Sequence, residues 1–172
     1  MFVTTGGDSM KIFLTSDTHF NHTNIIKYCN RPFHNIHDMN ESIIRKWNEV
    51  VSEDDLVYHL GDVGLGNNEE LKAIIDRLNG TKILLKGNHD LRRGNQHWLN
   101  IGFKEVYKKE IRLGEYVLTH RPTIVDKGLI NIFGHIHDKE LDGNWSKNQH
   151  INVSTDVTNF TPVEFNEEKG II

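Results

Sequence analysis

Short apolar runs and helical patterns alternate through the first half of the chain. Each run is rich in Ile, Leu and Val and is flanked by polar residues, which is typical of a buried strand. The three predicted strands cover residues 11–16, 55–60 and 81–86. Two amphipathic segments between them predict helices, one over residues 38–51 and one from Asn67 or Asn68 to a stop at Gly80. Strands that alternate with helices predict parallel pairing through crossover helices.

The pattern changes in the second half of the chain. Asp38 is expected to cap the helix predicted over residues 38–51, because Glu41 follows it by the spacing of a capping box. A short helix is expected over residues 94–101, before the change. The apolar runs then follow one another closely, as in antiparallel hairpins. These predicted strands cover residues 103–107, 109–113, 115–119, 129–133, 150–153 and 161–165. The whole pattern indicates one α/β domain with mixed sheets in two layers.

Composition limits the classes of protein that fit this pattern. The 172 residues suit a single domain, expected over residues 10–172, after a polar stretch at 1–9 that is expected to be a disordered leader. The formal charge of -4 disfavours sequence-independent binding to a phosphate backbone. No apolar stretch reaches the roughly 20 residues of a membrane span and no secretory signal is recognisable, so the expected compartment is the cytoplasm. Cys29 is the single cysteine, which excludes an internal disulfide and a thiolate-rich zinc site.

Polar residues of three types, Asp, Asn and His, follow five of the predicted strands. In chain order they are Asp17 and His19, Asp62, Asn88 with His89 and Asp90, His120, and His135 with His137. Open α/β sheets bind ligands beyond the carboxyl ends of their strands, so these segments are expected to meet in one crevice. Three of them are directly preceded by a glycine, at Gly61, Gly87 and Gly134, where glycine allows a sharp exit from the strand and a close backbone approach to an ion.

Seven of these side chains offer oxygen or nitrogen donors, and none offers sulfur. They are Asp17, His19, Asp62, Asn88, His120, His135 and His137. Such a set suits a divalent transition metal, with Mn preferred and Fe, Zn, Ni or Co as alternatives, and does not suit a structural zinc finger. Seven donors exceed the needs of one tetrahedral ion, whereas two ions that share Asp62 could divide them evenly. Two such ions would keep a surplus of positive charge beside the two carboxylates, which can hold a hydroxide and attract a phosphate ester.

The order of these motifs resembles one enzyme family. The motifs are Asp-x-His at 17–19, Gly-Asp at 61–62, Gly-Asn-His-Asp at 87–90, a lone His at 120 and Gly-His-x-His at 134–137. Together they resemble the calcineurin-like metallophosphoesterases, and the run from Asp17 to Ile26 resembles the small single-domain bacterial and phage branch of that superfamily. In the protein serine/threonine phosphatases a Val-Asp-Arg-Gly type of run follows Gly-Asp, whereas Val63-Gly-Leu-Gly66 follows it here. A protein phosphatase of that branch is therefore not expected.

The resemblance implies a fold and a mechanism. The family fold is a double β-sandwich of mixed sheets flanked by helices. By analogy, the first metal would be held by Asp17, His19, Asp62 and His137, and the second by Asp62, Asn88, His120 and His135. A metal-bridging hydroxide would attack phosphorus in line, His89 would protonate the leaving group as general acid, and Asp90 would orient His89. The implied activity is that of a phosphodiesterase or phosphatase on small phosphate esters, nucleotides included.

Three further residues are candidates for contact with the substrate. His22 follows His19 by three residues and could touch the substrate, although a polar residue at the start of a helix is the alternative. Arg31 and Arg121 could each clamp a phosphate through two parallel hydrogen bonds, and a surface salt bridge is the alternative for both.

Two other functions stay open at the level of sequence. One is a nuclease of the same fold, in which a local basic strip of Lys82, Lys86, Arg92 and Arg93 would contact nucleic acid in spite of the acidic balance. The other is a non-catalytic metal-binding scaffold for protein partners. The scaffold is disfavoured because the seven ligand positions and His89 all carry chemically competent residues.

Overall fold

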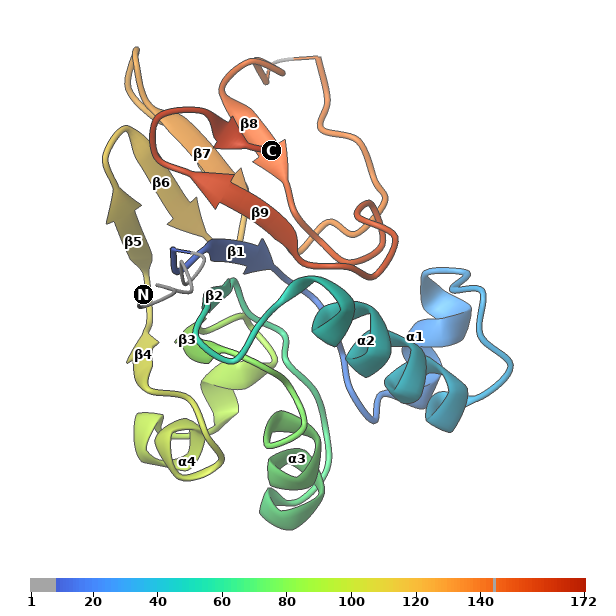
Figure 1. Cartoon of the computed structure of the whole chain (residues 1–172). Helices are drawn as coiled ribbons and strands as arrows, with labels where there is room; N and C mark the ends of the chain where they lie inside the picture. Colours follow the sequence, from blue (N-terminus) through green and yellow to red (C-terminus); the bar gives the residue numbers. More distant parts are fainter. Residues whose placement is uncertain (1–8, 144) are drawn as a thin grey trace, which may run out of the picture.

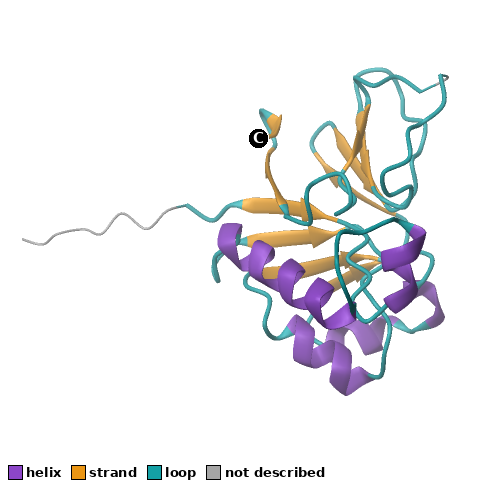
Figure 2. Ribbon diagram, turned by 90° about the vertical axis from the view of Figure 1, so that its right-hand side faces the viewer, coloured by secondary structure: helices purple, strands orange, loops and turns teal. Residues whose placement is uncertain are grey.

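Two β-sheets pack face to face, and helices cover the outer face of the larger sheet (Figure 1 and Figure 2). The computed structural model describes residues 9–143 and 145–172, so the leader predicted for residues 1–9 lies outside the described residues except for Ser9. The larger sheet has the strand order β10-β9-β1-β2-β3-β4, and the smaller sheet has the order β5-β6-β7-β8. Both sheets contain parallel and antiparallel pairs, which confirms the predicted α/β class with two mixed sheets flanked by helices.

Apart from β10, the strands lie within two residues of the positions that the hydrophobic pattern predicts. Those of the larger sheet are β1 (Ile12–Thr15), β2 (Leu56–His59), β3 (Thr81–Leu85), β4 (Glu105–Tyr107), β9 (Val163–Asn166) and β10 (Gly170–Ile171). Those of the smaller sheet are β5 (Glu110–Leu113), β6 (Tyr116–Thr119), β7 (Ile130–Phe133) and β8 (His150–Asn152). The helices are α1 (Thr23–Tyr28), α2 (Ile36–Val50), α3 (Asn68–Ile75), α4 (Asn95–Asn100) and the 3₁₀ helix η1 (Asp90–Arg92). None of the described helices is long and apolar enough to cross a bilayer.

Successive side chains along each strand point to opposite faces of the larger sheet, and each face carries its own hydrophobic core. On β1, Phe13 packs into the core beneath the helices, whereas Leu14 faces the smaller sheet. Trp47 of α2 fills the core beneath the helices, and Leu118 of β6 fills the core between the sheets. Full burial of an apolar side chain of the size of Leu contributes roughly 1.5–3 kcal/mol. The larger sheet is therefore the middle layer, and burial of apolar side chains on both of its faces stabilises it.

The direction of several strands in the second half differs from the prediction. The β5–β6 pair is antiparallel as expected, but β3–β4, β6–β7 and β7–β8 are parallel. A short apolar run does not encode strand direction, and the intervening segments 120–129 and 134–149 are long enough to return the chain to the same end of the sheet. Parallel pairing brings the carboxyl ends of β6 and β7 to one edge.

The helix termini also differ in part from the prediction. Helix α2 begins at Ile36, and its N-cap is Asn35, whose side chain accepts a hydrogen bond from the N–H of Asp38 at 2.9 Å. Asp38 was predicted to be the cap, but the N–H that its carboxylate accepts belongs to His34. In α3 the cap is Asn67, as predicted, and the helix ends at Ile75, earlier than predicted. Helix α1 begins directly after His22, which agrees with the alternative given for that residue, a polar residue at the start of a helix. Strand β10 was not predicted.

Candidate metal centre

The predicted ligand residues lie on loops that follow five strands of the two sheets. Strands β1, β2 and β3 lead to Asp17, Asp62 and Asn88, β6 leads to His120, and β7 leads to His135 and His137. β1, β2 and β3 are parallel in the larger sheet, and β6 and β7 are parallel in the smaller sheet. Within each sheet the carboxyl ends of these strands share one edge, which is where open α/β sheets bind ligands.

Direct hydrogen bonds tie these loops to one another. The N–H of Asp17 donates to the carbonyl of Gly61 at 2.9 Å, and the N–H of His19 donates to the carbonyl of Asp62 at 3.1 Å. Across the two sheets, the N–H of His135 donates to Oδ2 of Asp17 at 2.8 Å. One carboxylate oxygen of Asp17 therefore holds the loops together, and Oδ1 is left to face the crevice.

Three glycines allow the loops to approach this closely. A Cβ atom at Gly134 would lie 2.3 Å from Oδ2 of Asp17, and one at Gly87 would lie 2.2 Å from Oδ1 of Asp62. A Cβ atom at Gly61 would lie 2.3 Å from the backbone nitrogen of Gly87. The glycines thus let the loops approach one another closely. Their predicted close approach to an ion stays a prediction.

Two groups of potential metal ligands converge in the crevice between the loops. In each group, one donor atom from each of three residues lies within 4.8 Å of the others. The first group is Asp17, His19 and His137, and the second group is Asp62, His120 and His135. Oδ2 of Asp62 lies 3.5 Å from Nε2 of His120 and 3.7 Å from Nε2 of His19, so this atom lies between the groups. Oδ1 of Asn88 lies 3.0 Å from Nε2 of His120 and adds a donor to the second group.

Two buried atoms of the first group fit a cation. Oδ1 of Asp17 and Nε2 of His19 are buried, and within residues 9–143 and 145–172 neither has a hydrogen-bond partner. A buried polar atom without a partner costs about 1–3 kcal/mol, and a charged one costs more. A divalent cation would satisfy both atoms. The donor set of carboxylates, imidazoles and one amide suits the transition metals predicted from the sequence.

The charges in the crevice favour ionised carboxylates. Burial raises the pKa of Asp17, but the neighbouring imidazoles, led by that of His19, outweigh burial and hold the pKa below its usual range. Burial also raises the pKa of Asp62, but the hydrogen bond and charge of His120, together with the charge of His19, outweigh burial and lower the pKa. Both carboxylates are therefore charged at neutral pH, which is the form that binds a metal.

Hydrogen bonds at the far ring nitrogen orient two of the imidazoles. Nδ1 of His120 lies 2.7 Å from the carbonyl of Leu60, and Nδ1 of His137 lies 2.7 Å from Oδ2 of Asp156. A neutral ring that donates from Nδ1 presents the lone pair of Nε2 to a metal. Sequence analysis missed Asp156. The signal was available, because Asp156 follows the predicted strand 150–153 as the other ligand residues follow theirs.

Arg31 differs from its expected role as a substrate clamp. Its Nε and Nη2 atoms donate to the carboxylate of Asp156, both at 2.9 Å. Nη2 also donates to the carbonyl of Asp17 at 2.7 Å, and Nη1 donates to the carbonyl of Thr18 at 2.9 Å. The side chain is 0 % exposed. These contacts hold the buried guanidinium of Arg31 behind the first ligand group, away from the solvent.

Asp90 also differs from its expected role. Its carboxylate accepts hydrogen bonds from the N–H groups of Asp62 at 2.6 Å, Gly87 at 2.8 Å and Val63 at 3.1 Å. Among the described residues, no hydrogen bond joins it to the ring of His89, which it was expected to orient. Burial is the main cause that raises the pKa of Asp90 to about 6. Asp90 therefore joins the loops after β2 and β3.

His89, His22 and Arg121 lie on the open side of the crevice. The side chain of His89 is 43 % exposed. The ring of His22 lies 5.2 Å from that of His19 and 6.0 Å from that of His89, measured between centroids. Arg121 is exposed, and its positive charge adds to the effect of burial in lowering the pKa of His135. All three side chains are placed where a bound molecule could reach them.

The backbone at the ligand positions is unusual. Five of the seven predicted ligands have a positive φ, between 51° and 70°. They are Asp17, His19, Asp62, His135 and His137. Non-glycine residues seldom adopt this conformation, and strained residues of this kind cluster at functional sites.

Comparison with known proteins identifies the family. Residues 10–168 match the model of the calcineurin-like phosphoesterase family. The chain belongs to this family. Its metal-dependent members hydrolyse phosphate esters, so the chain is a metal-dependent phosphoester hydrolase in general terms. The uncharacterised protein MJ1445 of Methanocaldococcus jannaschii is 42 % identical over 163 residues, which cover 89 % of this chain and 86 % of that protein.

Two solved structures share the architecture. A protein of unknown function from Aquifex aeolicus, AQ665, has a TM-score of 0.70 and 26 % identity and covers 91 % of this chain and 96 % of its own. The nuclease MPE of Pseudomonas putida has a TM-score of 0.51 and 19 % identity, with 73 % of this chain and 61 % of its own covered. At that identity the second likeness shows the fold alone. The predicted resemblance to the calcineurin-like metallophosphoesterases is confirmed.

Proposed function

We propose that the chain hydrolyses small phosphate esters with two divalent transition-metal ions. The ligands of the first ion are Asp17, His19, Asp62 and His137, and those of the second are Asp62, Asn88, His120 and His135. The observation that carries this proposal is the position of Oδ2 of Asp62, 3.7 Å from Nε2 of His19 and 3.5 Å from Nε2 of His120. A carboxylate oxygen between two ligand groups suits a residue shared by two metals. Mn is the preferred metal, with Fe, Zn, Ni or Co as alternatives.

In the proposed reaction the metal ions and the side chains have different roles. When bound, divalent ions at such a site neutralise phosphate charge and lower the pKa of water. In this proposal His89 donates a proton to the leaving-group oxygen. It belongs to neither ligand group, its side chain is 43 % exposed, and its Nε2 lies 3.9 Å from Oδ2 of Asp62. The ring centroid of His22 lies 6.0 Å from that of His89, and the exposed Arg121 directly follows His120; both would contact the rest of the substrate.

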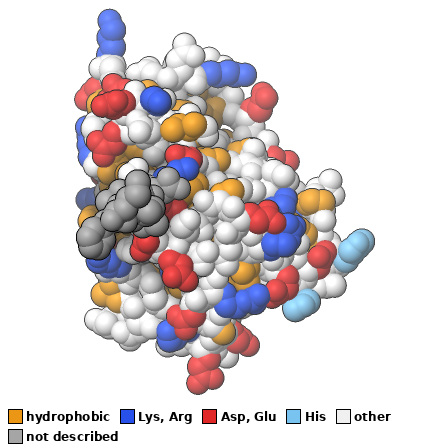
Figure 3. Space-filling view, in the orientation of Figure 1, with side chains coloured by type: hydrophobic (Ala, Val, Ile, Leu, Met, Phe, Trp, Pro, Cys, Tyr) orange, Lys and Arg blue, Asp and Glu red, His pale blue; other side chains and the backbone are white. Residues whose placement is uncertain are grey.

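A nuclease is the second candidate function, and the fold of the Pseudomonas putida enzyme supports it. The predicted basic strip argues against it. Nζ of Lys82 donates to the carbonyls of Leu78 and Gly80, and Nζ of Lys86 donates to the carbonyl of Arg93 at 2.6 Å. The ammonium groups of these lysines therefore bind backbone carbonyls of the protein and are not directed at a nucleic acid. Acidic and basic side chains are interspersed over the face shown in Figure 3, where no broad basic patch gathers.

A substrate panel tests the proposal. Purified protein would be stripped with chelator, reloaded with Mn, and assayed on phosphomonoesters, linear diesters, cyclic nucleotides and short oligonucleotides. We expect turnover of at least one small ester, dependent on Mn, with two metals bound per chain. Preferential cleavage of oligonucleotides would favour the nuclease. Less than one metal per chain, without turnover of any ester, would favour the non-catalytic scaffold and contradict the proposal.

A further inference from the structure

A buried ion pair joins the first and last ligand motifs of the chain. Arg31 and Asp156 have side chains that are 0 % and 4 % exposed, and two parallel hydrogen bonds of 2.9 Å connect them. The same guanidinium donates to the carbonyls of Asp17 and Thr18. Removing two charges from water is costly, and a buried ion pair is therefore a weak argument for stability. Its contacts lie on the segments that carry the first ligand group, which points to a role in placing those ligands.

The ion pair acts on one ligand group and not on the other. Oδ2 of Asp156 lies 2.7 Å from Nδ1 of His137, whose Nε2 lies 3.9 Å from Oδ1 of Asp17. In the second group, the corresponding nitrogen of His120 faces the backbone carbonyl of Leu60. A side-chain substitution removes the carboxylate but leaves the carbonyl. The first group alone is therefore sensitive to a change at Asp156.

We propose that the Arg31–Asp156 pair sets the metal affinity of the Asp17, His19 and His137 group without setting that of the second group. This inference rests on the proposed function. Without the carboxylate of Asp156, the ring of His137 is free to turn away, and the charge of Arg31 stands unpaired close to Asp17, where it repels a cation. Partners of this kind typically contribute ten- to hundred-fold in metal affinity.

Metal content tests the inference directly. Wild-type protein and Asp156→Asn would be titrated with Mn, and the bound metal would be counted after gel filtration. We expect two ions for wild type and about one for Asp156→Asn, with the weaker dissociation constant raised roughly ten- to hundred-fold. The matched control is Asp54→Asn, an exposed aspartate in the turn before β2, which should bind both ions.

The outcomes separate this inference from the proposed function. Two ions at unchanged affinity in Asp156→Asn would overturn the inference and leave the proposed function standing. Fewer than two ions in wild type would contradict the two-metal proposal, and the inference would then hold only if Asp156→Asn loses the metal that wild type retains. Arg31→Lys keeps the charge but loses the forked contact, and it should weaken the same metal by a smaller factor. This variant decides the question if Asp156→Asn does not fold.

A second inference rests on a separate observation, a row of rings that leads from the first ligand group to the surface. The centroid of His22 lies 5.2 Å from that of His19 and 6.4 Å from that of Tyr28, whose ring stands edge-on to it at 84°. Tyr28 is the last residue of α1 and is 74 % exposed. An aromatic ring left in water beside a phosphate-binding crevice offers a flat face to a planar group of the substrate.

We infer that Tyr28 stacks on the base of a nucleotide ester whose phosphate lies at the metal centre. This inference deepens the proposed function by naming the substrate class. Stacking of a base on an aromatic side chain is tolerant of sequence because every base has a π-face, and loss of one such ring weakens binding by about ten-fold. A small methyl ester cannot make this contact.

A pair of chromogenic diesters tests the stacking. The p-nitrophenyl ester of thymidine 5′-phosphate and methyl p-nitrophenyl phosphate share a leaving group and differ in the nucleoside. Tyr28→Ala should raise KM for the nucleoside ester about ten-fold and leave KM for the methyl ester unchanged, while Tyr28→Phe should resemble wild type. Tyr107→Ala, at another exposed tyrosine, is the control.

Other outcomes decide against the stacking. Equal changes in KM for both esters, or no change for either, would overturn it. If wild type hydrolyses neither diester, the panel of monoesters and cyclic nucleotides still decides the proposed function, and calorimetric binding of thymidine 5′-monophosphate to wild type and Tyr28→Ala decides on Tyr28 alone. Equal affinities in that measurement would overturn the inference.

Discussion

Gly134 lies so close to Asp17 that a methyl group on its α-carbon would come within 2.3 Å of Oδ2. The contact arises where the loop after β7 crosses the loop after β1, and it joins the two sheets at the metal centre. We expect Gly134→Ala to force these loops apart, lower the free energy of unfolding by about 1–3 kcal/mol and weaken the first metal site. Chemical denaturation and metal titration measure the two effects.

Gly94→Ala is the control for that substitution, since a Cβ atom at Gly94 would meet no atom within 4 Å among the described residues. We expect its stability to stay within about 0.5 kcal/mol of wild type. Equal stability and equal metal affinity in Gly134→Ala would show that the loops can separate without consequence.

Asp62→Asn should remove both metals and nearly all activity. Asp62 is the residue whose oxygen approaches ligands of both groups, and an amide supplies a weaker, neutral donor in its place. Metal analysis and turnover of the best ester of the panel provide the measurement, with Asp54→Asn as the control. Full occupancy and wild-type turnover in Asp62→Asn would remove the shared ligand from the mechanism.

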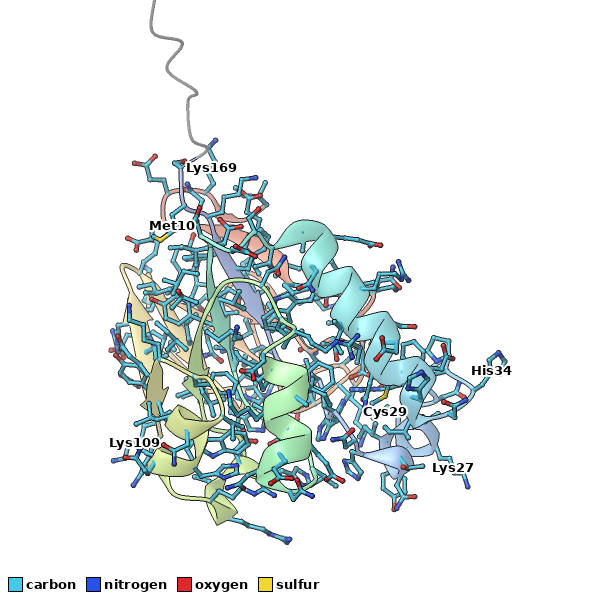
Figure 4. All side chains as sticks on the ribbon, turned by 60° about the horizontal axis from the view of Figure 1, so that its bottom comes forward. Met10, Lys27, Cys29, His34, Lys109 and Lys169 are labelled. Carbon is cyan, nitrogen blue, oxygen red and sulfur yellow. The ribbon has the colours of Figure 1, made fainter. Side chains whose placement is uncertain are left out.

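His89→Ala should bind the same number of metals as wild type, and its kcat should fall most for esters with a basic leaving group. A general acid contributes about 10²–10⁴-fold when the leaving oxygen is basic, and much less when it is a good leaving group such as p-nitrophenolate. The measurement is kcat on an alkyl ester against an aryl ester of the same phosphate. The control is His34→Ala, because His34 projects at the periphery of the molecule (Figure 4). Equal losses on both esters would argue against an acid role.

Metal binding should release protons at neutral pH. Burial lowers the pKa of His137, but the hydrogen bond to Asp156 and the nearby carboxylates outweigh burial and raise the pKa to about 10. The metal-free ring therefore holds an extra proton at pH 7, and the stability that this proton provides is full below pH 6.5 and lost as the pH rises toward 10. A metal must displace the proton, so affinity for the first metal should rise by up to about ten-fold per pH unit in this window.

Calorimetry in two buffers of different ionisation enthalpy counts the protons released when Mn binds. We expect about one proton from the first site at pH 7.5 and a smaller number in Asp156→Asn. Mn binding whose heat is the same in both buffers would contradict the raised pKa of His137.

The sequence predicted which candidate ligands lie together better than it predicted the connections of the fold. Asp17, Asp62 and His120 could be grouped because a candidate ligand at a strand end needs only a local pattern, an apolar run followed by a polar residue. Strand direction is a property of two distant segments, and for this reason the parallel pairing of β7 with β8 was not foreseen. The error at the Asp38 cap has a local cause, because Asn35, three residues earlier, offers a similar side chain.

The supporting residues were harder to predict than the ligands. An arginine with no local partner resembles a surface or substrate-binding residue, and nothing near Arg31 in the sequence indicates that Asp156 will accept its hydrogen bonds. Asp90 follows His89 directly, which suggested contact between them, but its carboxylate turns toward the backbone of the loop after β2. Burial and long-range pairing decide such roles, and local patterns carry little information on either.

The positive φ of five ligand residues has a cost for the fold. A left-handed residue with a side chain is less stable than glycine in that position by roughly 1–2 kcal/mol. Glycine at Asp17 or His135 should therefore relax the backbone while it deletes a metal ligand. At these positions the residue that favours thermal stability differs from the residue that favours metal binding. A screen for thermal stability alone would therefore be expected to select glycine there and to lose the metal ligands.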